Sequence, residues 1–227
     1  WGEMLDEQDV FDFSNFVADS KEDGSLVLLY NYDGKWMANT KGSFAMDLMQ
    51  FQEKTWQQAI MEALEVSDLQ QLKLDPNFTY VCEFVSPYNK IVRRYHRPEL
   101  FLLTAVERID EYRTRELSAA EVHKIDLIQF SKPFRQAFKS IEHIQQTLAA
   151  YSKDDPTFEG FVIRDCNNQR WKIKSPTYLA LHRMRGEGDN LYDPKNLLPF
   201  IMAGEVAELL VYFPEVEQRV EEISATV

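Results

Sequence analysis

Short apolar runs separated by tight turns are the feature that most constrains the fold of this chain. Residues 26–30 predict a buried strand and residues 35–40 its return strand, since Asp33-Gly34 between them is typical of a hairpin turn. Further strands are predicted over residues 78–85, 89–95, 100–107, 159–165 and 170–174. Short connections of this kind join antiparallel strands, so we expect an antiparallel sheet.

Helical patterns lie between these strands and dominate after Ser175-Pro176. The predicted helices cover or begin at residues 44–65, 118 (capping box Ser118-Ala-Ala-Glu121), 140–151, 193 (with Pro194 at the first position) and 205–225. The predicted fold class is therefore α+β, with a strand-rich domain over residues 1–183 and a helical C-terminal appendage over residues 184–227.

The composition indicates a folded protein of a reducing compartment. Of 227 residues, 44% are apolar, yet no run approaches the ~18 apolar residues that a membrane span needs, and no signal peptide is visible. Two cysteines, Cys82 and Cys166, are too few for a disulfide framework. We therefore expect a cytoplasmic protein without a membrane partner. Because the chain begins at Trp1 and ends at Val227 inside a helical pattern, we also expect further residues beyond both ends.

The net charge of −12 argues against a nucleic-acid partner only until its distribution is considered. Residues 1–12 hold five acids and no base, and residues 204–222 hold six Glu against one Arg, so together they carry −10. The bases gather elsewhere, at Lys90, Arg93, Arg94 and Arg97 and at Arg164, Arg170, Lys172, Lys174, Arg183 and Arg185. We expect a basic cleft on an acidic body, with salt-dependent binding of nucleic acid.

Three short blocks in the first half carry candidate chemistry. Lys21-Glu22-Asp23-Gly24-Ser25, just before the first predicted strand, is either a charged surface turn or the site of a nucleophilic lysine. Thr40-Lys41-Gly42-Ser43 ends the return strand. Glu83 lies between apolar strand residues and faces either solvent or a cleft.

Two further blocks lie in the second half. Glu159-Gly160 begins a predicted strand, and Lys172 and Lys174 share one face of the next. Two adjacent lysines on one face are costly unless an anion such as phosphate lies between them, although a solvated basic face is the alternative. The four histidines, by contrast, show no metal-ligand spacing, and we predict no zinc site.

Taken in order, the five blocks closely resemble the RNA ligase 1 family, the tRNA-repair type of T-even bacteriophages, among the covalent nucleotidyltransferases. The matching segments are residues 21–27, 40–43, 83–92, 159–162 and 172–182, and the resemblance extends over about residues 10–210. It implies an antiparallel-sheet, ATP-grasp-like nucleotidyltransferase domain. It also implies ATP-dependent joining of 5′-phosphate and 3′-hydroxyl RNA ends through a lysyl-AMP intermediate.

The resemblance also assigns roles to individual residues. Lys21 matches the lysine that attacks the α-phosphorus of ATP, while Lys41, Lys172 and Lys174 match lysines near the ATP phosphates. Glu83 matches an acid that contacts the nucleoside sugar or a metal.

Other matched residues concern the metal and the substrate. Glu159 matches an acid that helps bind Mg²⁺ or Mn²⁺, and Tyr178 a tyrosine linked to substrate handling. Glu208, or Glu205, is the candidate for a C-terminal carboxylate near the metal. The family's upstream arginine-bearing strand falls before Trp1, and without it we expect the first step of ligation to fail.

The same resemblance suggests partners and leaves alternatives open. Nicked tRNA, a kinase–phosphatase repair partner, a monomeric state and the cytoplasm of a phage-infected host are the expectations. One alternative is a DNA ligase or a GTP-using capping enzyme, although helices rather than a barrel follow Ser175. The other is a catalytically inactive binding module, against which the complete set of charged residues argues.

Overall fold

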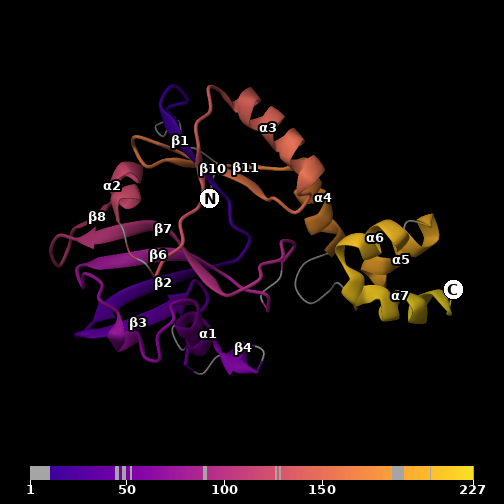
Figure 1. Cartoon of the computed structure of the whole chain (residues 1–227), viewed down its shortest axis with the longest axis horizontal. Helices are drawn as coiled ribbons and strands as arrows, with labels where there is room; N and C mark the ends of the chain where they lie inside the picture. The colour runs from indigo at the N-terminus through magenta and orange to yellow at the C-terminus, as the bar shows by residue number, and fades with distance from the viewer. Residues whose placement is uncertain are drawn as a thin grey trace.

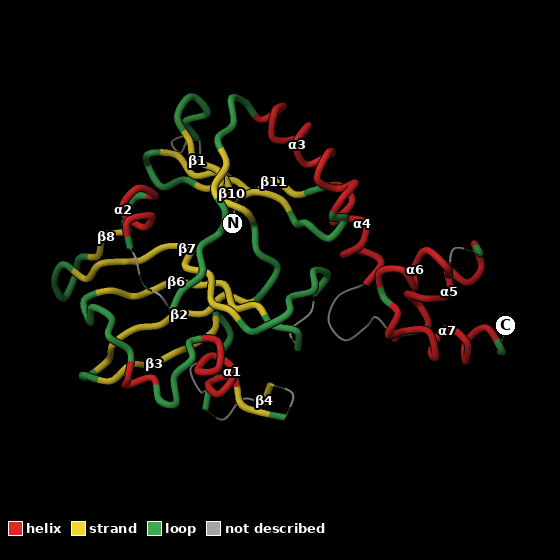
Figure 2. Tube along the Cα trace, viewed as in Figure 1, coloured by secondary structure: helices red, strands yellow, loops and turns green. Residues whose placement is uncertain are grey.

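In the computed structural model, the described residues form a larger and a smaller antiparallel sheet, one above the other, a short two-stranded sheet, and a helical C-terminal part (Figures 1 and 2). The structure describes residues 11–43, 46–47, 50–51, 53–88, 91–125, 127, 129–185, 192–204 and 206–226. Among these residues, no helix is long and apolar enough to cross a membrane.

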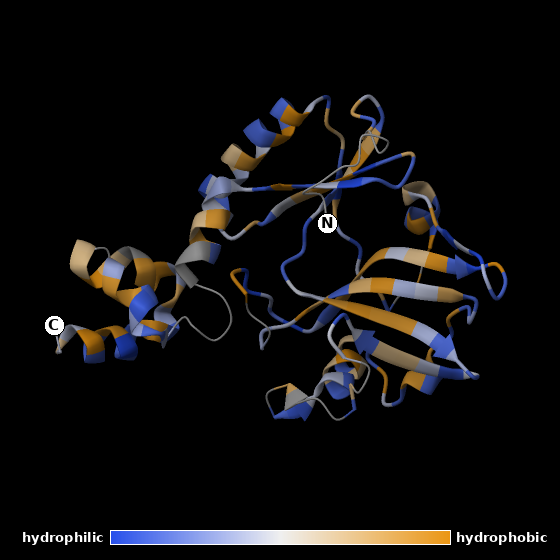
Figure 3. Cartoon of the chain, turned by 180° about the vertical axis from the view of Figure 1, so that it is seen from behind, coloured by the Kyte–Doolittle hydropathy of each residue, from blue (hydrophilic) through white to orange (hydrophobic). Residues whose placement is uncertain are grey.

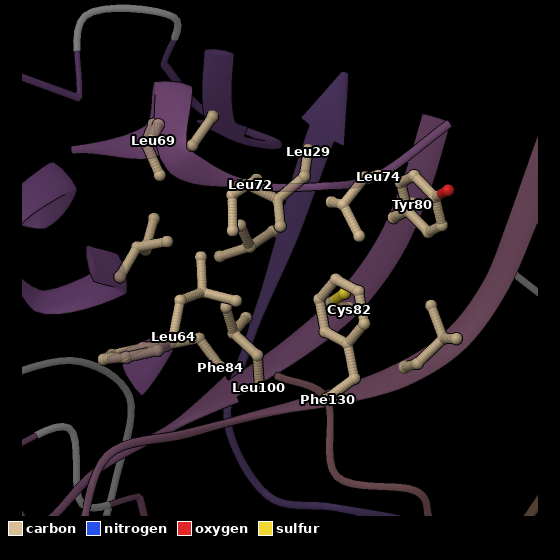
Figure 4. Close-up of a cluster of buried hydrophobic side chains, with 14 of the residues drawn as sticks. Leu29, Leu64, Leu69, Leu72, Leu74, Tyr80, Cys82, Phe84, Leu100 and Phe130 are labelled. Carbon is tan, nitrogen blue, oxygen red and sulfur yellow. The ribbon is translucent and has the colours of Figure 1, made fainter. Parts of the chain in front are cut away.

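The larger sheet has five strands in the order β3 (Lys35–Thr40), β2 (Ser25–Tyr32), β6 (Phe78–Val85), β7 (Glu99–Arg108) and β8 (Thr114–Glu116). Figure 3 shows hydrophobic and hydrophilic residues along each of its strands. Its buried face carries Val27, Leu29, Cys82 and Leu102. Helix α1 (Trp56–Ala63) covers that face with Ile60, and Figure 4 shows part of the resulting cluster.

The smaller sheet has four strands in the order β11 (Arg170–Lys174), β10 (Gly160–Asp165), β1 (Phe16–Ser20) and β9 (Arg135–Gln136). Helix α3 (Ile141–Asp154) packs Ile144 and Leu148 against Phe161 and Ile163 of β10. Because β1 belongs to the smaller sheet and β2 to the larger one, residues 21–24 form the crossing between the two sheets.

The C-terminal part has its own apolar cluster. Helix α4 (Pro176–Arg185) leads out of the smaller sheet, and α5 (Pro194–Ala203), α6 (Val206–Tyr212), the 3₁₀ turn η3 (Pro214–Val216) and α7 (Glu217–Ser224) follow. Leu197, Leu209 and Phe213 pack in one cluster with Tyr178 and Leu181 of α4. This cluster contains residues from both sides of residue 183, the predicted end of the strand-rich domain. The C-terminal helices therefore pack against α4, which directly follows β11.

The remaining elements are short: β4 (Gln50–Phe51), β5 (Lys54–Thr55), the 3₁₀ turn η1 (Leu69–Gln71) and α2 (Ala119–Lys124). Two predicted helix starts are confirmed, since Ser118 forms the capping box of α2 and Asp193 caps α5 with Pro194 at its first position.

Two predicted elements are wrong in extent. In place of one helix over 44–65, α1 is confined to Trp56–Ala63, because the side chain of Thr55 caps it through a capping box with Gln58, and β4–β5 precede it. The acidic helix over 205–225 is interrupted at Pro214, since proline cannot continue the hydrogen-bond ladder. Strands β1, β8 and β9 were not predicted.

The predicted strand over 89–95 is also wrong where the structure describes it, over residues 91–95, while residues 89 and 90 lie outside the described residues. The backbone N–H groups of Val92 and Arg93 donate to the Asp23 carboxylate at 2.8 and 2.9 Å instead of pairing with a neighbouring strand. A buried side-chain acceptor thus replaces the sheet partner that the apolar pattern suggested.

Candidate active site

Three charged residues meet at one edge of the smaller sheet. Lys21 Nζ lies 2.8 Å from Glu159 Oε2, and Lys174 Nζ lies 2.9 Å from Glu159 Oε1. The sheet order explains this meeting, because Gly160 is paired with Lys174 across β10–β11 and its carbonyl accepts a 2.8 Å hydrogen bond from the Lys21 N–H. A carboxylate that is 2% exposed is therefore shared by two lysines.

Two glycines allow the close approach of the segments around this edge. A Cβ atom at Gly160 would lie 2.1 Å from the carbonyl oxygen of Ile173, and Gly160 has a φ of +143° that side-chain-bearing residues rarely adopt. A Cβ atom at Gly24 would lie 2.2 Å from the carbonyl oxygen of Phe84. Gly24 and Gly160 therefore allow the segments that carry Lys21 and Glu159 to lie close to their neighbouring strands.

Glu83 comes from the larger sheet and faces the same region. Its Oε1 accepts a 3.2 Å hydrogen bond from the Gly24 N–H, so the carboxylate points toward the crossing at residues 21–24, and a cleft at Glu83 stays a prediction. Burial raises the pKa of Glu83 to about 7, and the negative charge of Glu159 adds to this rise while Lys21 opposes it. Both sheets therefore contribute acids to one electrostatically coupled site.

Lys172 and Lys174 lie on one face of β11, as predicted. Lys174 forms an ion pair with Glu159, whereas Lys172 is exposed. Partial burial lowers the pKa of Lys172, and the positive charges of Lys21 and Lys174 lower it further. Three lysines near one another favour an anion with several charged oxygens.

A network of buried polar side chains holds the Lys21 segment from behind. Glu22 and Asp23 are 8% and 2% exposed, so the surface-turn interpretation of this block is wrong. Glu22 accepts hydrogen bonds from Ser20 at 2.6 Å and from the Tyr95 hydroxyl at 3.0 Å, and the Asp23 N–H donates to Tyr95 at 2.9 Å. Tyr95 was not predicted as a site residue. Its position shortly after Glu83 in the sequence is the only signal that could have suggested it.

Tyr178 joins this network from α4. It is 1% exposed, and its hydroxyl donates to Asp23 Oδ1 at 2.8 Å. Burial raises the pKa of Tyr178, and the charges of Glu159 and Asp23 raise it further. Its side chain therefore supports the segment that carries Lys21, and a role in substrate handling stays a prediction.

The other predicted residues lie apart from this network or outside the described residues. Lys41 is exposed in the turn after β3. Glu205 lies outside the described residues, and Glu208 lies in α6 but its side chain is outside them too.

The acidic residues of this site could bind a cation that also binds the phosphate oxygens of a substrate. Within the described part of the chain, no three His, Cys, Asp or Glu side chains are grouped as a complete metal site. Mg²⁺ is commonly held by one or two carboxylates together with substrate phosphates and water. Glu83 and Glu159 are the acids of this site that could donate to such a cation, since the charge of Glu159 contributes to the raised pKa of Glu83.

Comparisons with known proteins agree with this geometry. The RNA ligase family of the T4 ligase 1 type matches residues 5–178. A putative bifunctional polynucleotide kinase/RNA ligase of Autographa californica nuclear polyhedrosis virus is 28% identical over 213 residues. That match covers 89% of this chain and 28% of the viral protein, so this chain spans about a quarter of its relative.

Solved structures share the fold at low identity. An archaeal ATP-dependent RNA ligase has a TM-score of 0.58 at 15% identity, over 92% of this chain and 59% of its own. A putative ATP-dependent DNA ligase from Aquifex aeolicus has 0.54 at 15%, over 93% and 58%. A Naegleria gruberi RNA ligase solved with ATP and Mn has 0.54 at 14%, over 75% and 52%. These confirm the predicted nucleotidyltransferase fold, and because the family match covers most of its length, this chain belongs to the RNA ligase 1 family.

Proposed function

We propose that this chain is the nucleotidyl-transfer part of an ATP-dependent RNA ligase that works through a lysyl-AMP intermediate. The observation that carries the proposal is the meeting of Lys21, Glu159 and Lys174 within 2.9 Å contacts, opposite Glu83 of the second sheet. A lysine on a tightly held segment, beside further lysines and a buried carboxylate, suits nucleophilic attack on a phosphate.

Three balanced steps follow from this role. The Lys21 amine loses a proton and attacks the α-phosphorus of ATP, so that a P–N bond forms and pyrophosphate leaves. An oxygen of the RNA 5′-phosphate then displaces the lysine, which regains a proton, and AMP is joined to the RNA end. Finally, the 3′-hydroxyl loses its proton and attacks the 5′-phosphorus, which releases AMP.

The side chains around Lys21 have separate tasks in this proposal. Glu159 holds the Lys21 ammonium in place in the free protein, and this ion pair must open before the amine can attack. Lys172 and Lys174 bind the ATP phosphates and stabilise the charge that develops on them. Lys41 is proposed to reach the same phosphates from its exposed turn.

Glu83 and Glu159, with Glu208 as a further candidate, would hold Mg²⁺ or Mn²⁺. When bound, such a cation neutralises charge on the phosphate oxygens. Tyr178 keeps the nucleophile segment in register by holding Asp23.

The substrate is proposed from the family and its viral relative. RNA ends with a 5′-phosphate and a 3′-hydroxyl, including those of a nicked tRNA, are the proposed substrates. The kinase joined to a ligase in the viral relative fits a repair sequence in which a kinase supplies the 5′-phosphate. The setting we propose is the cytoplasm of an infected host cell.

Labelling with α-³²P-ATP and Mg²⁺ tests the central step. With a full-length protein that includes the upstream strand, we expect a covalently labelled band that Lys21→Ala abolishes, while Lys35→Ala, at the exposed start of β3, keeps it. Labelling by GTP in place of ATP would instead favour a capping enzyme. A wild-type protein that never labels, or a Lys21→Ala variant that still does, would contradict the proposal.

A further inference from the structure

Two adjoining cavities lie outside the site around Lys21. Their volumes are about 780 and 370 Å³, and both are lined by Arg93, Arg94 and Asp155. The larger reaches Phe101 of β7, and the smaller reaches Tyr212 of α6. We call this continuous surface the arginine groove.

The arginine groove and the candidate active site lie on different sides of the Lys21 segment. Ser20 and Glu22 line the larger cavity, whereas Lys21 between them contacts Glu159. Successive side chains of an extended segment point to opposite sides, which explains this division. The groove is thus next to the nucleophile without sharing its ion pairs.

Basic side chains form the rim of the groove. Arg94 and Arg97 have side chains that are 56% and 69% exposed, and their partners are Glu215 at 3.6 Å and Glu99 at 3.2 Å. Exposed pairs of this kind add little stability, so a phosphate can replace the carboxylate at small cost. Arg93, paired with Asp155 at 3.5 Å, and Lys132 add two further cations.

Three of the carboxylates that also line the larger cavity are occupied within the protein, whereas a fourth, Asp154, is exposed. Glu22 is buried and accepts from Ser20 and Tyr95, and Glu99 accepts a 2.6 Å hydrogen bond from Ser131. Asp155 accepts from Thr157 at its other oxygen. These three carboxylates therefore form hydrogen bonds within the side of the cavity, while the guanidinium groups of Arg94 and Arg97 remain accessible.

Aromatic side chains accompany these cations. Phe134 is 44% exposed and lines the larger cavity together with Phe101 and Tyr95. Accessible rings beside arginines are typical of surfaces that bind single-stranded nucleic acid, because bases stack on the rings and phosphates bind the cations.

We propose that the arginine groove binds a single-stranded segment of the RNA substrate next to the reacting end. Arg94 and Arg97 contact backbone phosphates, and Phe134 stacks on a base. The inference rests on the proposed ligase function and adds the surface that holds the strand. It also uses the basic run between Lys90 and Arg97, which the adenylation chemistry leaves without a role.

The test is the salt dependence of RNA binding without ATP. A fluorescein-labelled single-stranded RNA of about 12 nucleotides is titrated in KCl between about 50 and 200 mM. Arg94→Ala/Arg97→Ala is compared with Lys35→Ala/Arg113→Ala, which removes the same charge at exposed positions next to two hairpin turns. Each lost phosphate contact lowers the slope of log K against log salt by about 0.7. We expect a decrease of about 1.4 in the groove variant and none in the control.

A third variant separates stacking from charge. Phe134→Leu keeps an apolar side chain, and we expect about five-fold or more weaker binding with an unchanged salt slope. Equal slopes for the two double variants, or a wild-type protein that does not bind this RNA, would overturn the proposal. Labelling by ATP is measured separately on wild-type protein, so a failure of the ligase chemistry is recognised independently.

Discussion

At the scale of single residues, the site depends on carboxyl groups that are held away from water. Glu159 is almost fully buried and compensates this by binding two lysines. Glu83 has one hydrogen bond from a backbone N–H and no such pair of cations, and this difference explains why burial dominates its pKa. The surroundings of Glu83, and not its residue type, therefore raise its pKa.

The raised pKa of Glu83 predicts a pH-dependent stability. Since the folded state binds this proton more tightly than the unfolded chain, the contribution is most favourable below pH 4.5 and is lost as the pH rises through about 7. Glu83→Gln cannot titrate. We therefore expect the stability of wild type relative to this variant to fall by on the order of 1–3 kcal/mol between about pH 5 and 8.

Urea unfolding of metal-free protein at several pH values measures this difference. Glu111→Gln, in an exposed turn, is the matched control and should follow wild type throughout. Parallel curves for wild type and Glu83→Gln would show that the carboxyl does not titrate in this range.

At the scale of elements, α4 connects the segment that carries Lys21 to the C-terminal helices. Tyr178 packs in the C-terminal cluster through its ring and holds Asp23 through its hydroxyl. Asp23 in turn accepts the N–H groups of Val92 and Arg93. One tyrosine therefore joins a helix, an irregular segment and the crossing between the sheets.

Removal of the Tyr178 hydroxyl should weaken this connection. Tyr178→Phe keeps the packed ring but leaves one oxygen of the buried Asp23 carboxylate without its donor, and we expect a loss of about 1–3 kcal/mol in unfolding free energy. Chemical denaturation measures the loss. Tyr112→Phe, at a ring that is 92% exposed, should change it by less than about 0.5 kcal/mol. Equal effects of the two substitutions would disprove the coupling.

At the scale of the whole molecule, the two sheets must keep a fixed relation so that Glu83 faces Lys21. Apart from the crossing at residues 21–24, a polar contact joins them at β8. Glu116 of β8 pairs with Arg170 of β11 and lies 3.5 Å from Arg164 of β10, which is 5% exposed. Arg164 also donates to the Leu117 carbonyl, so β8 is held to the smaller sheet by side chains instead of a ladder.

Glu116→Gln should destabilise the chain at neutral pH. Burial raises the pKa of Glu116, but hydrogen bonds from Arg170 and Thr104 outweigh it and leave the pKa lowered. The stabilisation is therefore present above pH 4.5 and is lost as the pH falls below it. We expect a cost of about 1–3 kcal/mol at neutral pH that shrinks in acid.

Thermal or urea unfolding of this variant is compared with Glu222→Gln, which removes one acid of an exposed i,i+3 pair with Arg219. The exposed pair should contribute no more than about 1 kcal/mol. If the two variants cost the same, the Glu116 contact does not hold the sheets.

The sequence by itself determined the strands with strong apolar patterns, the capped helix starts and the ordered blocks that identify the family. These features depend on residues close together in the chain, so local pattern is sufficient. Three features follow only from the tertiary structure: the burial of Glu22 and Asp23, the irregular backbone at residues 91–95, and the support of Lys21 by Tyr95 and Tyr178. Each of these depends on partners about 70 to 155 residues away. Burial and hydrogen bonding at such separations follow from how the two sheets cross, which no local pattern records.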